Sequence, residues 1–445
     1  MAEPFFRPYE PDQQLLLPPS LRDWLPEGHL AWFISDTVDA LDLSAFLVRY
    51  RQEKSGNVAY HPALMCKLLL YGYATGVFSS RRIAQACETD VAFRVLSAGQ
   101  FPSHRTVARF RKEHLAAFEG LFVQVVGIAH DAGLVELGTV AIDGSKVRAN
   151  ASKHKAMSYE RMKQEQKRLS QEIRALVQRA EDVDAAEDAE LGEDVRGDEL
   201  PQEIRRREDR LRVIREAAKR LEKRKKEEDA EAIAAEKERQ AQGKGKRGPK
   251  RKHPLGKPKP KDQENFTDPD SRIMNTKKDG FQQCYNAQIA VDAKEQIIVA
   301  VQVEQSASDV SFLVPMIERT KENTGKAPKV VLADAGYKSE GNFQSLEEDG
   351  IRGYIPLGRE GAELRREPDP GLEATCRMRR RMASRRGKVR YRKRKHIAEP
   401  PFGWIKGVLG FRRFLLRGLP NVRGEWNLVA LGVNLRRMGT NWAWA

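Results

Sequence analysis

The sequence predicts an α/β protein: a mixed β-sheet flanked by helices, with an all-helical domain before it and a helical coiled-coil insertion within it. Three observations predict this arrangement. Short apolar runs rich in β-branched residues recur after residue 133, separated by stretches of helical periodicity. Residues 1–132 carry apolar side chains at helical spacing. Residues 153–262 are highly charged, and two stretches of them have apolar residues at heptad-like spacing.

The composition indicates a large, basic chain. Its 445 residues are many for one compact domain, and a hydrophobic fraction of 40% is enough for a core. The 79 Lys and Arg against 63 Asp and Glu give a formal net charge of +16, which favours nucleic acid as a partner. The sequence shows neither an apolar run long enough for a membrane nor a signal pattern, so we expect a cytoplasmic protein with no membrane partner.

The cysteines and histidines do not form a metal-binding pattern. The four cysteines are scattered, no pair has the spacing of zinc ligands, and the eight histidines do not cluster. We therefore expect reduced, structural cysteines. Any metal should be held by oxygen ligands, which favours Mg²⁺ or Mn²⁺.

Residues 1–132 are predicted to form an N-terminal helical DNA-binding domain. A predicted helix at 103–118, followed by another at 121–132, has Val107 and Phe110 on one face, and Arg105 and Arg109 on others. Short helices followed by a basic amphipathic helix are typical of a DNA-docking module. A solvated charged face explains this helix equally well.

The first predicted strand, at 138–143, delivers an acid. Its apolar run ends in Asp143 and Gly144, which places a carboxylate at the exposed end of a buried strand. An aspartate before glycine is commonly a turn former. Two later acids, each in a position where it could meet Asp143, change that interpretation.

The second acid follows another short buried strand. An antiparallel hairpin is predicted from strands at 285–291 and 297–303. A helix at 310–320, a strand at 329–333, a helix at 340–349 and a strand at 351–356 follow it. Asp334 ends the strand at 329–333, and Lys338 lies just beyond it. The first and fourth strands can be parallel neighbours, which would put Asp143 and Asp334 side by side. Lys338 could then touch a phosphate, although a solvated lysine is the more common case.

The insertion at 153–262 is predicted as an antiparallel coiled-coil hairpin. Helices at 157–180 and 202–240 flank an acidic stretch, 181–199, which we expect to be a solvated loop. The hairpin could dimerise, arch over DNA or act as a passive spacer. Residues 243–261 contain nine Lys or Arg with Gly and Pro throughout, and predict a disordered basic arm that contacts phosphate.

The third acid stands alone in a basic region. Glu399 is the only acid between Glu373 and Glu425, and it follows a run with twelve Lys or Arg in nineteen residues. Because two prolines follow it, we expect Glu399 near the start of a helix, with Lys406 two turns further along. The alternative is that Glu399 simply pairs with Arg394 or another nearby arginine.

Three carboxylates in a basic protein would form a site for two divalent ions. Such a pair of ions activates water or a 3′-hydroxyl and stabilises the leaving oxygen of an in-line phosphoryl displacement. The phosphate-binding candidates nearby are Lys146, Arg148, Lys338 and Lys406. Asp268, Asp270 and Glu425 are rival carboxylates, although the DPDS setting of the first two is typical of a turn.

Five stretches together resemble the DDE transposases of bacterial insertion sequences, which have an RNase H-like catalytic domain. They are AIDGSKVRANAS, DPDSRIM, YNAQIAVD, ADAGYKSEGN and YRKRKHIAEPPFGWIKGVLGFRRFLLRG. The chain is most similar to the subgroup with a helical insertion after the first strand of that domain. The last stretch resembles the family's tyrosine–arginine–glutamate–lysine signature, which implies Glu399 as the third acid and Lys406 as the lysine. Arg394 lies one residue further from Glu399 than the common pattern, and Lys395 occupies the usual position.

The resemblance implies a catalytic domain at 133–425 and a C-terminal tail at 426–445. It implies cleavage at the element's ends and transfer of the 3′-hydroxyl to target DNA, with Asp143, Asp334 and Glu399 as metal ligands. It also implies terminal inverted repeats as the bound DNA, a homodimer or larger assembly, and action at the bacterial nucleoid. An inactive remnant that only binds DNA, and a metal-dependent nuclease on the same fold, are the alternatives.

Overall fold

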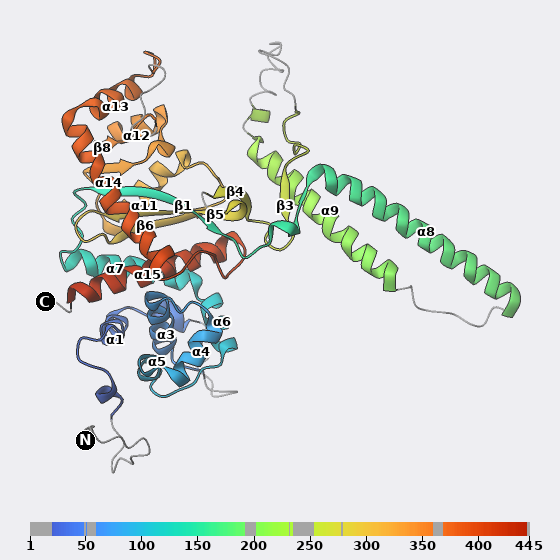
Figure 1. Ribbon diagram of the computed structural model, residues 1–445, viewed down its shortest axis with the longest axis horizontal. Helices are drawn as coiled ribbons and strands as arrows, with labels where there is room; N and C mark the ends of the chain where they lie inside the picture. Colours follow the sequence, from blue (N-terminus) through green and yellow to red (C-terminus); the bar gives the residue numbers. More distant parts are fainter. Residues whose placement is uncertain are drawn as a thin grey trace, which may run out of the picture.

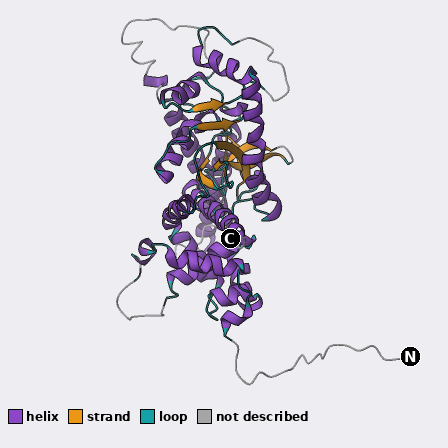
Figure 2. Cartoon of the chain, turned by 90° about the vertical axis from the view of Figure 1, so that its left-hand side faces the viewer, coloured by secondary structure: helices purple, strands orange, loops and turns teal. Residues whose placement is uncertain are grey.

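A mixed β-sheet lies at the centre of the protein, with a helical layer below it and a long helical hairpin projecting to one side (Figure 1). Turned by 90°, the same chain shows helices on both sides of the strands (Figure 2). The computed structural model describes residues 20–48, 50, 59–191, 202–230, 232–234, 253–276, 279–358 and 368–442. The predicted α/β class is thereby confirmed.

The sheet contains the strands that the sequence predicts and one more, at Arg272–Thr276. The order is β4-β5-β1-β7-β8, with β6 pairing β5 beside β4. The strands are β1 (Val140–Arg148), β4 (Arg272–Thr276), β5 (Gly280–Asp292), β6 (Ile298–Glu304), β7 (Val330–Ala333) and β8 (Arg352–Tyr354). Strands β5 and β6 form the expected hairpin, and β1 and β7 are parallel neighbours, as expected.

Strand β1 is longer than predicted. Its parallel pairing with β7 ends at Ile142, but its antiparallel pairing with β5 continues to Arg148, opposite Cys284. Asp143 therefore lies inside a strand and not at its end. The long partner β5 supplies hydrogen bonds through the polar stretch after Ile142, where the apolar pattern stops.

The N-terminal region is helical, as predicted. Its helices are α1 (Leu30–Ala40), α2 (Ser44–Leu47), α3 (Pro62–Thr75), α4 (Ser80–Thr89), α5 (Val91–Leu96), α6 (His104–Glu113) and α7 (Leu115–Asp131), after the 3₁₀ turn η1 (Leu21–Trp24). Helix α3 begins with Pro62 in its first turn and ends at Gly76 in the left-handed region, the usual signals for those positions. The helix predicted at 103–118 breaks at His114, so that α6 and α7 are separate.

Helix α15 (Leu419–Trp442) takes up residues 426–442 of the C-terminal tail expected at 426–445, and residues 443–445 lie outside the described residues. Residues 426–431 of this helix are buried, and the helix contacts α3, α7 and β6. It therefore lies between the N-terminal helices and the sheet, and one hydrophobic core spans both. A sequence with almost continuous apolar residues at 426–433 could not remain an exposed tail.

Glu425 joins this core to the N-terminal helices. Its side chain is fully buried, and its carboxylate accepts hydrogen bonds from the backbone N–H groups of Leu415 and Leu416, at 3.0 Å from Oε2 to each nitrogen. Tyr73 of α3 also donates to it, at 3.4 Å, and the guanidinium of Arg111 reaches that tyrosine hydroxyl at 3.2 Å. Glu425 is thus a structural acid, and the rival metal role considered for it is not supported.

We expect Glu425→Ala to destabilise the protein by about 3 kcal/mol, because it leaves buried donors without an acceptor and Arg111 without its compensating charge. Burial raises the pKa of Glu425, so a neutral acceptor of the same shape is tolerated better. Glu425→Gln should therefore cost clearly less. Urea unfolding of the two variants measures the difference. Equal midpoints for Glu425→Ala and wild type would contradict this role.

The insertion is an antiparallel helical hairpin, as predicted. Helix α8 (Tyr159–Leu191) runs against α9 (Gln202–Glu228). The Tyr159 hydroxyl donates to Glu222 at 2.5 Å, whereas Arg207 donates to Glu172 at 3.1 Å, so residue numbers rise along one helix as they fall along the other. The seam between them is a small separate core of Met162, Leu169, Leu211, Ile214, Ala217 and Ala218.

Two predictions for the insertion are wrong in part. The acidic stretch predicted as a loop continues α8 as far as Leu191, because alanines and glutamates there sustain a helix. The second part of the basic arm, 253–261, packs against the hairpin: the Gly256 N–H donates to Asp229 at 2.9 Å, and the Glu160 N–H donates to the Pro260 carbonyl at 3.2 Å. The first part of the arm, 243–252, lies outside the described residues.

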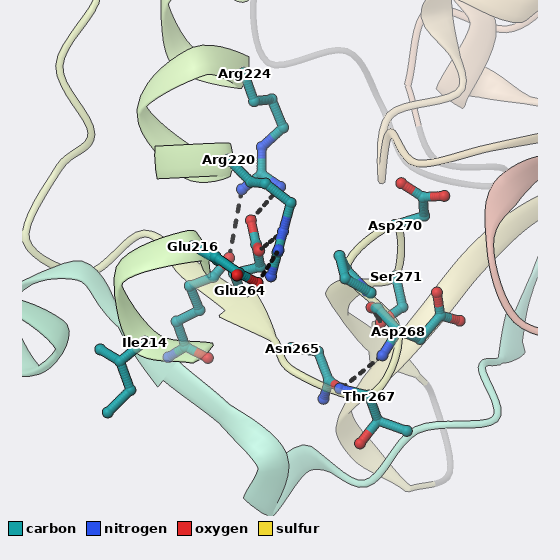
Figure 3. Close-up of polar contacts among 12 residues, drawn as sticks. Ile214, Glu216, Arg220, Arg224, Glu264, Asn265, Thr267, Asp268, Asp270 and Ser271 are labelled. Carbon is teal, nitrogen blue, oxygen red and sulfur yellow. Dashed lines mark hydrogen bonds and ion pairs between the residues drawn. The ribbon is translucent and has the colours of Figure 1, made fainter. Parts of the chain in front are cut away.

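A buried acid ties the insertion to the sheet. Strands β2 (Ala156–Ser158) and β3 (Gln263–Asn265) pair where the insertion leaves and rejoins the sheet domain. Figure 3 shows Glu264 of β3 turned toward two arginines of α9. The Glu264 carboxylate is 2.8 Å from Arg220 Nε and 3.7 Å from Arg224 Nη1, and its side chain is only 1% exposed. The hairpin is therefore held at its base by charge as well as by apolar packing.

None of the described helices is both long enough and apolar enough to cross a membrane.

Candidate active site

The first predicted acid, Asp143, lies on β1 where the neighbouring strand β7 stops. Its side chain is 17% exposed. Burial raises the pKa of Asp143 to about 6; Arg394 opposes this shift, and Asp334 and Asp309 add to it. Charged neighbours of both signs therefore surround this carboxyl group at the edge of the sheet.

The second acid, Asp334, directly follows β7. Its Oδ1 accepts the Gly336 N–H at 2.7 Å and so caps the short 3₁₀ turn η4 (Ala335–Tyr337). Because β1 and β7 are parallel neighbours, Asp143 and Asp334 come to the same edge of the sheet, as the sequence predicts. The negative charge of Asp334 helps to raise the pKa of Asp143, which supports that proximity. Lys338, just beyond, is exposed and donates to the Leu357 carbonyl at 2.6 Å.

The third acid, Glu399, lies near the end of a helix and not near its start. Helix α14 (Arg385–Gly403) begins behind the Ser384 cap and contains both prolines in its last turn. Pro400 has no N–H to offer the His396 carbonyl, and Gln296 Nε2 donates to that carbonyl instead, at 2.7 Å. The chain then widens into the π-helical turn η5 (Trp404–Val408). The prolines are thus tolerated at the end of α14, where the sequence pattern predicted the start of a helix.

Arg394 bridges two of the acids. Its side chain is only 10% exposed, and its guanidinium lies 3.2 Å from Asp143 Oδ2 and 3.8 Å from Glu399 Oε1. Lys395, which occupies the usual arginine position of the signature, is on the exposed side of α14. Arg394 therefore contacts two of the three predicted acids from the buried side of α14. Glu399 itself remains 56% exposed, at the rim of the site.

The other predicted basic residues divide into two groups. Lys406 donates to Ser145 Oγ and, at 3.1 Å, to the Lys146 carbonyl, and burial lowers its pKa. It therefore fastens η5 to β1 beside Asp143. Lys146 pairs with Asp309 at 3.1 Å, whereas Arg148 is 44% exposed at the end of β1, 3.9 Å from Asp279. Only Arg148 of these three is substantially exposed.

Arg105 and Arg109 are exposed on α6, far along the chain from the acids. The opposite face of that helix is buried through Val107 and Phe110, as predicted. The structure thus leaves both arginines open to a partner such as DNA.

Sequence reasoning missed Asp309. It precedes the turn η3 (Val310–Phe312) and helix α11 (Leu313–Thr324), between β6 and the next strand. Its carboxylate contributes to the raised pKa of Asp143. Burial raises the pKa of Tyr337, and the charges of three acids raise it further: Asp143, Asp309 and Asp334. The only sequence signal was an acid a few residues after an apolar strand, which also suits a helix cap.

The rival acids Asp268 and Asp270 serve the base of the insertion (Figure 3). Asp268 is fully buried, and its Oδ1 accepts from the Tyr285 hydroxyl at 2.8 Å and from the Gly418 N–H at 3.1 Å. Asp270 accepts the Leu419 N–H at 2.8 Å. Both acids therefore connect the loop after β3 to the start of α15, and the predicted turn role is the better supported one.

The site fits a divalent cation by its chemistry. As they stand, no three His, Cys, Asp or Glu side chains in the described parts of the chain are arranged to hold a metal ion. Asp143 and Asp334 nevertheless lie at one edge of the sheet. The guanidinium of Arg394 supplies the positive charge next to Asp143 and Glu399. Carboxylate oxygens in such a group are the ligands of Mg²⁺ and Mn²⁺. Glu399 would have to turn from Arg394 to join them.

Two family models identify the chain as a transposase of the DDE class. The family described as "Transposase DDE domain" matches residues 229–435, and a second, "Transposase domain (DUF772)", matches residues 19–113. No curated protein and no solved structure matches the chain. The chain belongs to the DDE transposases of insertion sequences. Its mixed sheet flanked by helices is consistent with their RNase H-like fold.

The first match does not include the first strand of the sheet. The matched segment contains Asp309, Asp334 and Glu399, but it begins beyond β1 and both helices of the hairpin. Asp143 therefore lies outside it. The pairing of β1 with β5 and β7 nevertheless makes β1 part of the same sheet.

Proposed function

We propose that this transposase cleaves DNA at the ends of its insertion sequence and joins the freed 3′-hydroxyl to target DNA. One observation carries the proposal: parallel pairing of β1 and β7 brings Asp143 and Asp334 to one edge of the sheet, and α14 presents Glu399 there beside Arg394. When bound, two Mg²⁺ or Mn²⁺ ions would activate the attacking hydroxyl and stabilise the leaving oxygen. Asp143, Asp334 and Glu399 would hold them.

The residues around the acids support that assignment. Lys406 anchors η5 on β1, so the end of α14 is fixed relative to Asp143. Arg394 keeps Glu399 near Asp143 by attraction to both. Arg148, exposed at the end of β1, and Lys338, exposed just beyond Asp334, would bind backbone phosphates of the DNA.

The remaining domains would supply the DNA and the assembly. We propose that residues 1–132 bind the terminal inverted repeats, with Arg105 and Arg109 of α6 on phosphate, and that residues 133–425 with α15 form the catalytic domain. The helical insertion, 153–262, would serve a homodimer or larger synaptic complex. Such a protein would act on the bacterial nucleoid in the cytoplasm.

The test is cleavage and joining of labelled duplexes that carry the element's terminal repeats, with Mg²⁺ or with EDTA. We expect nicks at the 3′ ends of the element and a joined product with a target plasmid, both only with the metal. Binding without nicks would favour the inactive remnant. Metal-dependent nicks without any joined product would favour the plain nuclease.

A further inference from the structure

Asp309 is held in a fixed position by three donors. Its Oδ1 accepts from Lys146 Nζ at 3.1 Å, from Asn286 Nδ2 at 2.6 Å and from Gln288 Nε2 at 2.9 Å. Lys146 belongs to β1, and the two amides belong to β5, where Lys146 and Asn286 are direct partners. Both amide side chains are fully buried, and Gln288 is in turn bonded by the Tyr337 hydroxyl. Strands β1 and β5 therefore determine where this carboxylate lies.

The second oxygen of Asp309 faces Asp334. A Cβ placed on Gly336 would lie 3.2 Å from Asp309 Oδ2 and 2.8 Å from Asp334 Oδ1, so both oxygens approach the same bare backbone position. The three donors all bind Oδ1; within the described chain, no hydrogen bond to Oδ2 is found. One oxygen is thus fixed by the sheet, and the other is directed to the second acid of the site.

Asp309 reaches this edge from the opposite face of the sheet. Side chains alternate along a strand. Asp143 and Ser145 therefore face α14 and η5, and Lys146 points to the other side of the sheet. Gly144 occupies a position on that other side. Gly144 has no side chain, and a Cβ there would lie 3.0 Å from Asp309 Oδ1. The glycine therefore leaves the space that lets an acid from the far face come close to Asp143 and Asp334. Helix α11, which follows Asp309, packs on β6 and β5, whereas α14 packs on β1 and β5.

We infer that Asp309 is a fourth carboxylate of the metal-binding site, with Oδ2 as its ligand oxygen. This inference rests on the proposed function. Its chemistry follows from the hydrogen bonds: Lys146 and the two amides fix the carboxylate through Oδ1, which leaves the anionic Oδ2 oriented for a divalent ion. A ligand fixed by its neighbours loses little conformational freedom on binding, and such outer partners hold metal ligands in orientation.

A purely structural acid is the competing explanation, and Asp309→Asn separates the two. The amide oxygen of asparagine can still accept from Lys146, Asn286 and Gln288, so the local hydrogen bonds are largely retained. The variant loses the charge and the anionic oxygen on the side of Asp334. A structural role thus predicts little change, whereas a ligand role predicts weaker metal binding.

The measurement is a titration of the DNA-free protein with Mn²⁺, following the signal of free Mn²⁺ by electron paramagnetic resonance. We expect Asp309→Asn to bind Mn²⁺ at least about tenfold more weakly than wild type. Its melting temperature without metal should stay close to that of wild type. Asp349→Asn, an exposed acid at the end of α12 (Glu340–Glu348), is the matched control and should bind as wild type does.

Asp143→Asn distinguishes failure of this inference from failure of the proposed function. If Asp143→Asn weakens Mn²⁺ binding but Asp309→Asn does not, Asp309 is structural and the proposed site survives. If neither variant changes binding, or wild type has no saturable site, the proposed site itself is wrong and the inference falls with it. Unfolding of Asp309→Asn would overturn the ligand role unless Asp309→Glu, which keeps the charge, restores both fold and binding.

Discussion

Asp143→Asn should lower cleavage of the element's ends by at least about 10³-fold, roughly 4 kcal/mol of lost transition-state stabilisation. The neutral amide keeps the shape of the side chain and a contact for Arg394, but it is a poor ligand for a divalent ion. Binding of terminal-repeat DNA should be unchanged, because the region proposed to bind it, 1–132, does not contain Asp143 and retains Arg105 and Arg109 on its surface. Single-turnover cleavage and a gel-shift titration measure the two effects.

The stability of this variant gives an independent check. The folded-state pKa of Asp143 is raised to about 6, so the ionised group opposes folding above that pH. Its favourable contribution is present below the ordinary aspartate range and is lost as pH rises to about 6. Metal-free Asp143→Asn should therefore be at least as stable as wild type at pH 8. If cleavage and DNA binding are lost together with the fold, Asp143 is a structural residue and the proposal fails.

Gly144→Ala should reduce cleavage by about 10²-fold, although it replaces none of the acids. The added Cβ would overlap the Gln288 amide nitrogen, lie 2.8 Å from Gln288 Cδ and lie 3.0 Å from Asp309 Oδ1. Gln288 is fully buried and bonded to Asn286, Asp309 and Tyr337, so it cannot move alone. A displacement of about 1 Å within a reacting site is enough for such a loss. Overpacking should also cost about 1–3 kcal/mol of stability.

The matched control for this substitution is Gly138→Ala. Gly138 lies just before the same strand, and a Cβ there meets nothing within 4 Å. We expect its cleavage rate to equal that of wild type in the same single-turnover assay. If Gly144→Ala cleaves as fast as Gly138→Ala, the close approach of Asp309 and Gln288 to β1 has no part in the reaction.

The sequence predicted most of the sheet because its strands follow strong local patterns. Strand β6 starts with a continuous apolar, β-branched run, β7 is apolar throughout, and β5 alternates before it becomes apolar. The parallel pairing of β1 with β7 follows from their positions in the order of elements. Where the pattern became polar, as after Ile142, the prediction stopped although β1 continues. Pairing with β5 decided that segment, and pairing is not visible in one strand alone.

The errors have similar causes. Pro400 and Pro401 normally mark the first turn of a helix, but Gln296, a hundred residues earlier, satisfies the carbonyl that Pro400 leaves free. The apolar run at 426–433 was assigned to a tail because its partners, α3, α7 and β6, lie far away in sequence. Asp309 was missed for the same reason, since its three donors come from β1 and β5. In each case a long-range contact outweighs the local signal.

The central claim is that Glu399 acts with Asp143 and Asp334, and Glu399→Gln tests it most directly. Wild type, Glu399→Gln and the matched control Glu348→Gln, an exposed acid on α12, are compared on labelled terminal-repeat DNA with Mg²⁺ and with EDTA. We predict nicks for wild type and the control with Mg²⁺ only, and a loss of at least about 10²-fold for Glu399→Gln. Metal-dependent nicking by Glu399→Gln at the wild-type rate would contradict the account and leave Asp309 as the third carboxylate.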